Sequence, residues 1–215
     1  DAMRVMAEQV FLDTDLSMSD ISLIDFYSCF PSAVEFARDV FGVPKDDPRP
    51  LTVTGGLPFH GGAGNNYVMN SIASMIDRLR EFPGSFGLVT ANGGYFSKHS
   101  AGIYSTARRE PSWLRTSPEK YQRVIDSVRD VPFTENPSGD GLVETYTVLF
   151  DRDNRPSQGL VIGRMGKSLD DQNSPRFFSI VDGDSLLLES LTRQDMIGER
   201  GKVYLKEGLN RFRFL

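Results

Sequence analysis

The spacing of apolar residues in the first half of the chain alternates between a helical and a strand-like period. Apolar residues recur every three or four positions over Pro31–Phe41 and Asn66–Glu81, which predicts two helices, the second buried on most sides. Short apolar runs around them predict the strands Ser22–Tyr27, Leu51–Thr54, Phe86–Thr90 and Ala101–Ser105. Strands that alternate with helices predict an α/β layered domain with a mostly parallel sheet and one antiparallel addition.

The pattern changes beyond residue 107. Turn-forming residues bracket one amphipathic segment, Pro118–Val128, which predicts a linker with a helix over residues 108–140. From residue 141 the apolar period is two, and strand-like runs cover Val143–Phe150, Gly159–Gly163, Arg176–Val181, Gly201–Leu205 and Phe212–Phe214. Short strands separated by turns predict a small all-β, OB-like barrel over residues 141–215, after a first domain over residues 1–107.

Composition narrows the class of protein. The chain has 215 residues, 39% of them hydrophobic, a net charge of −5 and a pI near 5.1. This charge argues against nucleic-acid or membrane-surface binding, and the single cysteine excludes an intramolecular disulfide. With no signal peptide and no apolar run long enough to span a membrane, the sequence predicts a cytoplasmic protein. A helical pattern directly after Asp1 indicates a truncation boundary within a longer gene product.

A glycine-rich segment around His60 is the strongest candidate for chemistry. It follows the Leu51–Thr54 run and leads into the helix that starts near Asn66, with glycines on both sides of the histidine. Glycines allow a close approach of the backbone to a ligand, and a helix N-terminus favours an anionic atom. Imidazole is the side chain best suited to proton transfer near neutral pH. The alternative is a strand-to-helix turn that is glycine-rich for packing reasons alone.

Three ordered blocks of the sequence resemble those of the thiolase superfamily. The segment around His60 is similar to the family's G-H-P-x-G-x-x-G loop, with Gly61 at the usual proline. Tyr27–Phe30 is similar to the Asn-Glu-Ala-Phe box, which reads His-Asp-Cys-Phe in sterol-carrier-type thiolases, and Ala91–Gly94 to the C-terminal Cys-x-Gly-Gly block. The resemblance implies that residues 1–107 are the C-terminal half of a thiolase fold. Residues 141–215 resemble the additional C-terminal domain of mycobacterial and actinobacterial thiolase-like proteins.

The resemblance implies acyl transfer between coenzyme A thioesters. The nucleophilic cysteine lies in the N-terminal half of a thiolase, and His60 takes the place of the histidine that accepts its proton. Tyr27 takes the place of the residue that helps to hold the thioester oxyanion. Ala91 stands where thiolases carry a second, basic cysteine, so condensation lacks its usual base unless His99 replaces it. Cys29 is not at the nucleophile position, and we interpret it as a structural thiol.

The predicted site combines three catalytic residues with glycine backbone. The catalytic residues are His60, Tyr27 and Asn92, which we expect to meet at one end of the sheet, and substrate contacts come from Gly61, Gly62, Gly93 and Gly94. No metal site and no covalently bound cofactor is expected; a coenzyme A thioester is the substrate or ligand. Two functions remain open, an acetyl-CoA acetyltransferase-like enzyme and a non-condensing acyl-CoA-binding protein with the β domain as a partner or carrier module. The missing N-terminal half, or self-association, is expected to cover the exposed face.

Overall fold

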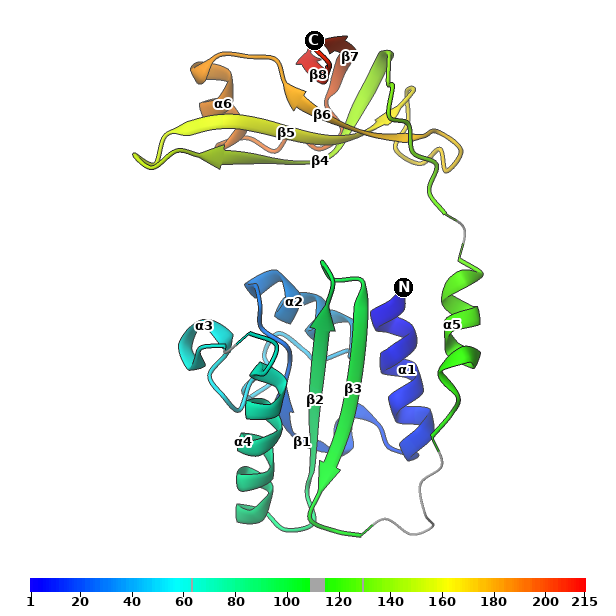
Figure 1. Ribbon diagram of the computed structural model, residues 1–215, viewed down its shortest axis with the longest axis vertical. Coiled ribbons are helices and arrows are strands. Elements are labelled where there is room, and N and C mark those ends of the chain that lie inside the picture. The colour runs from blue at the N-terminus through cyan, green and yellow to red at the C-terminus, as the bar shows by residue number, and fades with distance from the viewer. Residues whose placement is uncertain (63, 109–114, 129) are drawn as a thin grey trace. The chain divides into compact units, whose positions relative to one another are not determined.

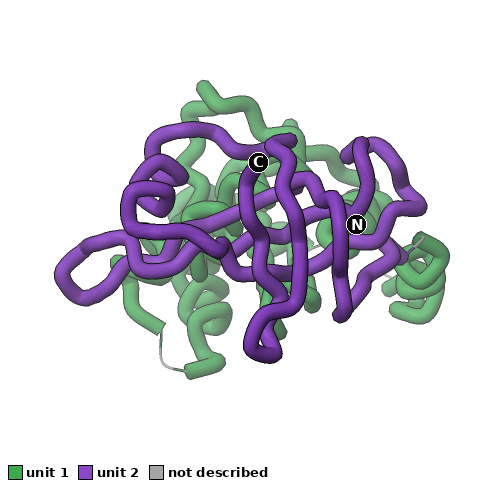
Figure 2. Tube along the Cα trace, turned by 90° about the horizontal axis from the view of Figure 1, so that it is seen from above, with its two compact units in different colours: residues 1–128 green, residues 129–215 purple. Residues whose placement is uncertain are grey.

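The computed structural model describes residues 1–62, 64–108, 115–128 and 130–215 and divides into two compact units. The first comprises residues 1–128 and the second residues 129–215 (Figure 2). The sequence-based division into three segments stays a prediction, and the helix expected in its linker falls within the first unit. Among the described residues, no helix has the length and apolar character needed to cross a membrane.

The first unit is built on a sheet of three strands. These are β1 (Ile21–Asp25), β2 (Phe86–Gly93) and β3 (Lys98–Ser105), in the order β1-β2-β3 (Figure 1). The pair β1 and β2 is parallel, and β2 and β3 form an antiparallel hairpin. The mixed α/β class is therefore confirmed. A mostly parallel sheet is not seen in the described part of the chain, where one of the two pairs is antiparallel.

Helices cover both faces of this sheet. Met3 and Ala7 of α1 (Ala2–Thr14) and Ala37 of α2 (Pro31–Val40) are buried with Leu88 of β2 in one apolar cluster. On the other face, α4 (Tyr67–Glu81) buries Met75 and Leu79 against Val89. The predicted helices at residues 31 and 66 are thus present, and α2 starts on a proline, which suits the first helical turn. The remaining helical segments are η1 (Met18–Asp20), α3 (Leu57–His60) and α5 (Pro118–Asp126).

Two sequence-based expectations about this unit are wrong. The helix α4 is buried along one face only, through Tyr67, Ser71, Met75 and Leu79, whereas Met69 is 62% exposed. The expected strand Leu51–Thr54 is not formed. Only one backbone hydrogen bond, from Phe26 N to Leu51 O at 2.9 Å, links it to the end of β1, because the next amides bind the carboxylate of Asp25 instead of a neighbouring strand.

The second unit is a closed barrel of five strands. The strands are β4 (Gly139–Phe150), β5 (Pro156–Met165), β6 (Arg176–Val181), β7 (Arg200–Lys206) and β8 (Leu209–Phe214), in the order β4-β5-β6-β8-β7. The rings of Phe177 and Phe212, both fully buried, stack at the centre with centroids 6.0 Å apart.

The barrel unit is not all-β as predicted. A helix, α6 (Ser185–Leu191), lies between β6 and β7 and buries Leu188 and Leu191 against the barrel core. Its start is set by Asp184, whose carboxylate accepts a hydrogen bond from Leu187 N at 2.9 Å. Because Leu186, Leu187 and Leu188 are consecutive, the sequence of this short segment does not show the spacing of apolar residues that is typical of a helix.

The barrel core requires glycine at position 163. A Cβ there would lie 2.3 Å from Cζ of Phe177 and 2.7 Å from the carbonyl oxygen of Leu142. We expect Gly163→Ala to lower the free energy of unfolding of the barrel by about 1–3 kcal/mol, the usual effect of overpacking. Urea-dependent hydrogen exchange of β5 peptides measures this change. Lys167→Ala, at an exposed position nearby, is the control, and equal stabilities of the two variants would contradict the packing described here.

Candidate active site

The candidate site begins with a buried carboxylate at the end of β1. Asp25 is fully buried, and its Oδ2 atom accepts hydrogen bonds from Val53 N at 2.9 Å and from Thr54 N and Oγ1 at 3.2 Å. Its Oδ1 atom has no hydrogen-bond partner within the described residues. Burying a carboxylate is costly unless hydrogen bonds compensate it, so these contacts fix the segment that leads into the glycine-rich loop.

A chain of hydroxyl groups continues from this carboxylate. Thr54 Oγ1 lies 2.6 Å from the hydroxyl oxygen of Tyr67, which lies 3.2 Å from Oγ of Ser28. Ser28 Oγ in turn accepts a hydrogen bond from Leu57 N at 2.7 Å. All three hydroxyl-bearing residues are buried. The chain ties β1, the glycine-rich loop and the first turn of α4 together.

His60 stands exposed at the end of the short helix α3. The helix lies between Gly56 and Gly61, whose φ angles of 94° and 80° suit glycine alone. The imidazole ring contacts the Tyr67 ring edge-on, with centroids 6.0 Å apart. Gly61 and Gly62 are exposed next to the histidine. The loop thus exposes the imidazole of His60 at the surface of this unit, and the buried ring of Tyr67 packs against it.

Tyr27 contacts the same phenol ring of Tyr67. Its ring packs edge-on against that of Tyr67, at a centroid distance of 5.6 Å, and its amide donates to Thr90 Oγ1 at 2.9 Å. Partial burial raises the pKa of the Tyr27 hydroxyl, so the phenol stays protonated and able to donate a hydrogen bond at neutral pH. Tyr67 therefore links Tyr27 and His60.

A pocket of about 480 Å³ brings Tyr27 together with Asn92, Gly93 and Gly94. Cys29, the half-buried lone cysteine, lines the same pocket, whereas His60 does not. The structure thus places four of the predicted residues in one pocket. It connects His60 to them through Tyr67 rather than through a shared cavity.

The strand register separates Ala91 from His99. Asn92 pairs directly with His99, and Ala91 with Ser100, so His99 shares the face of Asn92. Successive residues of a strand point to opposite faces, and Ala91 has the same parity as Val89, which packs against α4. His99 lies on the opposite face, where its Nδ1 atom is 3.0 Å from Asn92 Oδ1 and burial lowers its pKa. His99 therefore does not occupy the place of a base at Ala91.

Sequence reasoning missed the buried polar residues that support the loop. From the sequence, Asp25 lies within a predicted strand, Thr54 ends another and Tyr67 starts a helix, and none of the three has a predicted role. The available signal is that Asp25 is the one charged residue of the predicted strand Ser22–Tyr27. It is a weak signal, because its partners lie 28 residues and more away in the chain.

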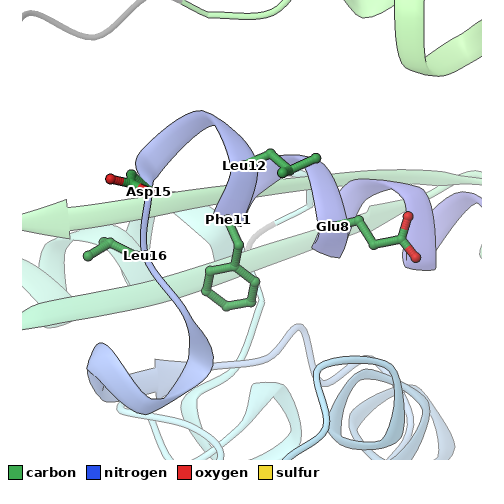
Figure 3. A pocket seen from close by; sticks show the side chains of 5 residues that line it. All are labelled: Glu8, Phe11, Leu12, Asp15 and Leu16. Atoms are coloured by element: carbon green, nitrogen blue, oxygen red, sulfur yellow. The ribbon is translucent and has the colours of Figure 1, made fainter.

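A second concavity lies at the C-terminal end of α1 and contains no predicted site residue. Glu8, Phe11, Leu12, Asp15 and Leu16 line it (Figure 3). Leu12 is 77% exposed there, and the acidic residues Glu8 and Asp15 are among the lining residues. Within the described residues, no group of three or more histidine, cysteine and acidic side chains is placed to hold a metal ion.

An α/β unit that presents a histidine on a glycine-rich loop, followed by a β-barrel unit, is the organisation implied by the thiolase resemblance. A family model described as the thiolase-like protein type 1 additional C-terminal domain matches residues 120–207. A crystal structure of a monomeric SCP2-thiolase-like protein type 1 from Mycobacterium smegmatis matches with a TM-score of 0.86 and 39% sequence identity. The match covers 100% of this chain and 45% of that one. No curated protein matches. The chain is therefore similar to thiolase-like proteins, and it spans less than half the length of the one that it matches.

The hydroxyl of Tyr67 is central to the site, which allows a direct test. Tyr67→Phe removes this hydroxyl, so that Thr54 Oγ1 keeps its contact with Asp25 and Ser28 Oγ its contact with Leu57 N, but each loses one buried hydrogen-bond partner. We expect a loss of about 1–3 kcal/mol in the free energy of unfolding of the first unit. Urea-dependent hydrogen exchange of β1 and β2 measures it. Tyr95→Phe, at a fully exposed tyrosine, should have no effect; the hydroxyl chain is refuted if both variants behave like the wild type.

Proposed function

We propose that the complete protein binds acyl-CoA thioesters and exchanges their acyl group without condensing two of them. The observation that carries this proposal is that the chain has a histidine at position 60 but an alanine, which cannot accept a proton, at position 91. His60 is exposed on its glycine-rich loop beside Tyr67, whereas Ala91 offers no proton acceptor on the α4 face. Its direct neighbour on β3 is Ser100, which is not a base at neutral pH. Acyl exchange needs one base, and condensation needs a second.

In this proposal a cysteine thiol from a segment outside this chain is the nucleophile. His60 accepts the thiol proton, and the thiolate sulfur attacks the carbonyl carbon of the thioester. The C–S bond to coenzyme A then breaks, and the leaving thiolate takes the proton back from the imidazolium of His60. Tyr27 donates a hydrogen bond to the developing oxyanion. Asn92 and the bare backbone of Gly61, Gly62, Gly93 and Gly94 contact the substrate.

A second candidate function is thioester binding without any transfer. It is favoured by Tyr27, because a phenol reaches further than the asparagine or histidine that the thiolase box carries. The oxyanion donor is then misplaced for transfer, while a bound thioester is still held. In this case the barrel unit is a partner or carrier module.

Isotope exchange between acetyl-CoA and labelled coenzyme A tests acyl exchange directly. We expect the complete wild-type protein to catalyse this exchange and to form no acetoacetyl-CoA. His60→Ala should lower the exchange rate by about 10²–10⁴-fold, the effect of a positioned acid–base group, with coenzyme A affinity nearly unchanged. Lys167→Ala, at an exposed position of the barrel unit, is the control and should keep full exchange.

Each other result has a definite meaning. Loss of coenzyme A affinity in His60→Ala would make His60 a ligand contact and favour the second candidate function, thioester binding without transfer. A wild-type protein that binds acyl-CoA but catalyses no exchange would favour the same function. Equal exchange rates in the wild type and His60→Ala would make the histidine structural and reject the proposal. Formation of acetoacetyl-CoA by the wild type would contradict the interpretation that Ala91 leaves the site without the second base that condensation needs.

A further inference from the structure

His99 contacts a residue of the candidate pocket without lining the pocket itself. Asn92 on β2 and His99 on β3 are paired across the hairpin, so their side chains share one face of the sheet. Asn92 lines the pocket of about 480 Å³, whereas His99 is not among the lining residues. Both side chains are half-buried. An effect of His99 on a ligand in the pocket therefore acts through the amide group of Asn92.

Both nitrogen atoms of the His99 ring face an oxygen atom. Nδ1 lies 3.0 Å from Asn92 Oδ1, and Nε2 lies 2.9 Å from the carbonyl oxygen of Phe96. A carbonyl oxygen only accepts hydrogen bonds, so each of the two nitrogens has to carry a proton for both bonds to form. Two N–H donors are present only in the imidazolium ion. The arrangement is therefore that of a protonated ring.

The turn between β2 and β3 decides which of the two protons His99 can lose. Tyr95 and Phe96 have φ angles of 52° and 67°, a left-handed conformation that is unfavourable for residues other than glycine. The hydrogen bond from His99 Nε2 to the Phe96 carbonyl stabilises this turn, as does the edge-on contact of the two rings, with centroids 4.9 Å apart. The proton on Nε2 is therefore retained, and the proton on Nδ1 is the one that leaves.

Loss of the Nδ1 proton reverses what His99 requires of Asn92. The neutral ring has a lone pair on Nδ1, which repels a carbonyl oxygen and accepts a hydrogen bond from an N–H group. The Asn92 amide meets this requirement when it turns over about its Cβ–Cγ bond and directs its NH2 group at His99. The other end of the amide is left for the pocket. That end is the NH2 group when His99 is protonated and the carbonyl oxygen when His99 is neutral.

We propose that His99 is a positioning residue whose protonation decides whether Asn92 offers the pocket a hydrogen-bond donor or an acceptor. The proposal rests on the proposed function for its ligand, a thioester. The carbonyl oxygen of a thioester accepts hydrogen bonds, so it binds the NH2 group of Asn92 and is repelled by the amide oxygen. The pocket therefore favours a thioester carbonyl when His99 is protonated.

The surroundings of the ring determine where it titrates. Burial lowers the pKa of His99 below the usual value of 6.5, and the amino group of Asp1, at the start of α1, acts in the same direction against the carbonyl acceptor on Nε2. Lys98 belongs to the opposite face of β3. Tyr27 and Cys29 are the titratable residues of the pocket lining. The protonated state is thus present in acidic solution and is lost as the pH rises through the lowered pKa.

Nitrogen-15 NMR of the chain tests the pair without any ligand. Nε2 of His99 should stay protonated across the titration while Nδ1 loses its proton, and the side-chain NH2 signals of Asn92 should shift with the same midpoint. Asn92→Asp places a carboxylate against Nδ1 and should move the midpoint of His99 to higher pH. Asn65→Asp, at an exposed asparagine outside the pocket lining, is the matched control and should not move it.

Binding of acetyl-CoA to the complete protein tests the consequence for the ligand. The measured quantity is the ratio of acetyl-CoA to coenzyme A affinity, because coenzyme A lacks the thioester carbonyl. This ratio should fall by about three- to tenfold as the pH rises through the midpoint of His99, the effect of one hydrogen bond. His99→Phe keeps an aromatic ring beside Phe96 and removes both nitrogens, so the fall should disappear. His60→Ala removes the other histidine and should keep it.

The two experiments fail in distinguishable ways. If Nε2 is the atom that loses its proton, or if the Asn92 signals do not follow the titration of His99, the proposal is rejected. An affinity ratio that does not change with pH, or a fall that persists in His99→Phe, rejects the effect on the thioester while the proposed function stands. If the complete protein binds no acetyl-CoA at any pH, the proposed function fails, and the NMR titration alone decides whether His99 orients the amide.

Discussion

The carboxylate of Asp25 is the group on which the rest of the candidate site depends. It is fully buried at the end of β1, where it binds two backbone amides and one hydroxyl of the segment that precedes the glycine-rich loop. Removing a carboxylate from water is offset only when hydrogen bonds take the place of hydration. That requirement fixes the entry to the loop. Through Thr54 and Tyr67, the same requirement fixes the ring against which His60 packs.

The sheet then separates the candidate residues into two groups. The face covered by α4 includes the position of Ala91, and Tyr67 in the first turn of that helix carries the contact with His60. The face covered by α1 and α2 carries His99 and the strained turn that presents Phe96. Tyr27, just beyond the end of β1, contacts elements of both. Ala91 and His99 thus lie on opposite faces of the sheet, and Tyr27 contacts both sides.

Much of the fold is visible in the sequence because it depends on local patterns. The period of the apolar residues is enough to predict β2, β3 and the helices α2 and α4, since each buries a stripe that its own sequence contains. The segment Leu51–Thr54 has the composition of a strand, but its amides bind a side chain that lies far away in the sequence. The helix α6 is too short to show its period and is held by contacts with the barrel core.

The candidate site is predictable in part. Glycine, histidine and aromatic motifs point to His60, Tyr27 and Asn92, because a motif carries its own residue types. The support behind them is not predictable, because Tyr67 and Thr54 acquire a role only when the fold brings them beside Ser28 and Asp25. The relation of Ala91 to His99 depends on the register of a hairpin, which places the two on opposite faces.

Hydrogen exchange at the amides of Val53 and Thr54 tests the central claim most directly. If the carboxylate of Asp25 anchors the loop, these amides exchange slowly in the wild type. In Asp25→Ala they exchange at the rate of an unprotected segment, while Leu88 and Val89 in the β2 ladder keep most of their protection. Unchanged protection of Val53 and Thr54 in Asp25→Ala would show that the loop is held by something else, and would contradict this account of the site.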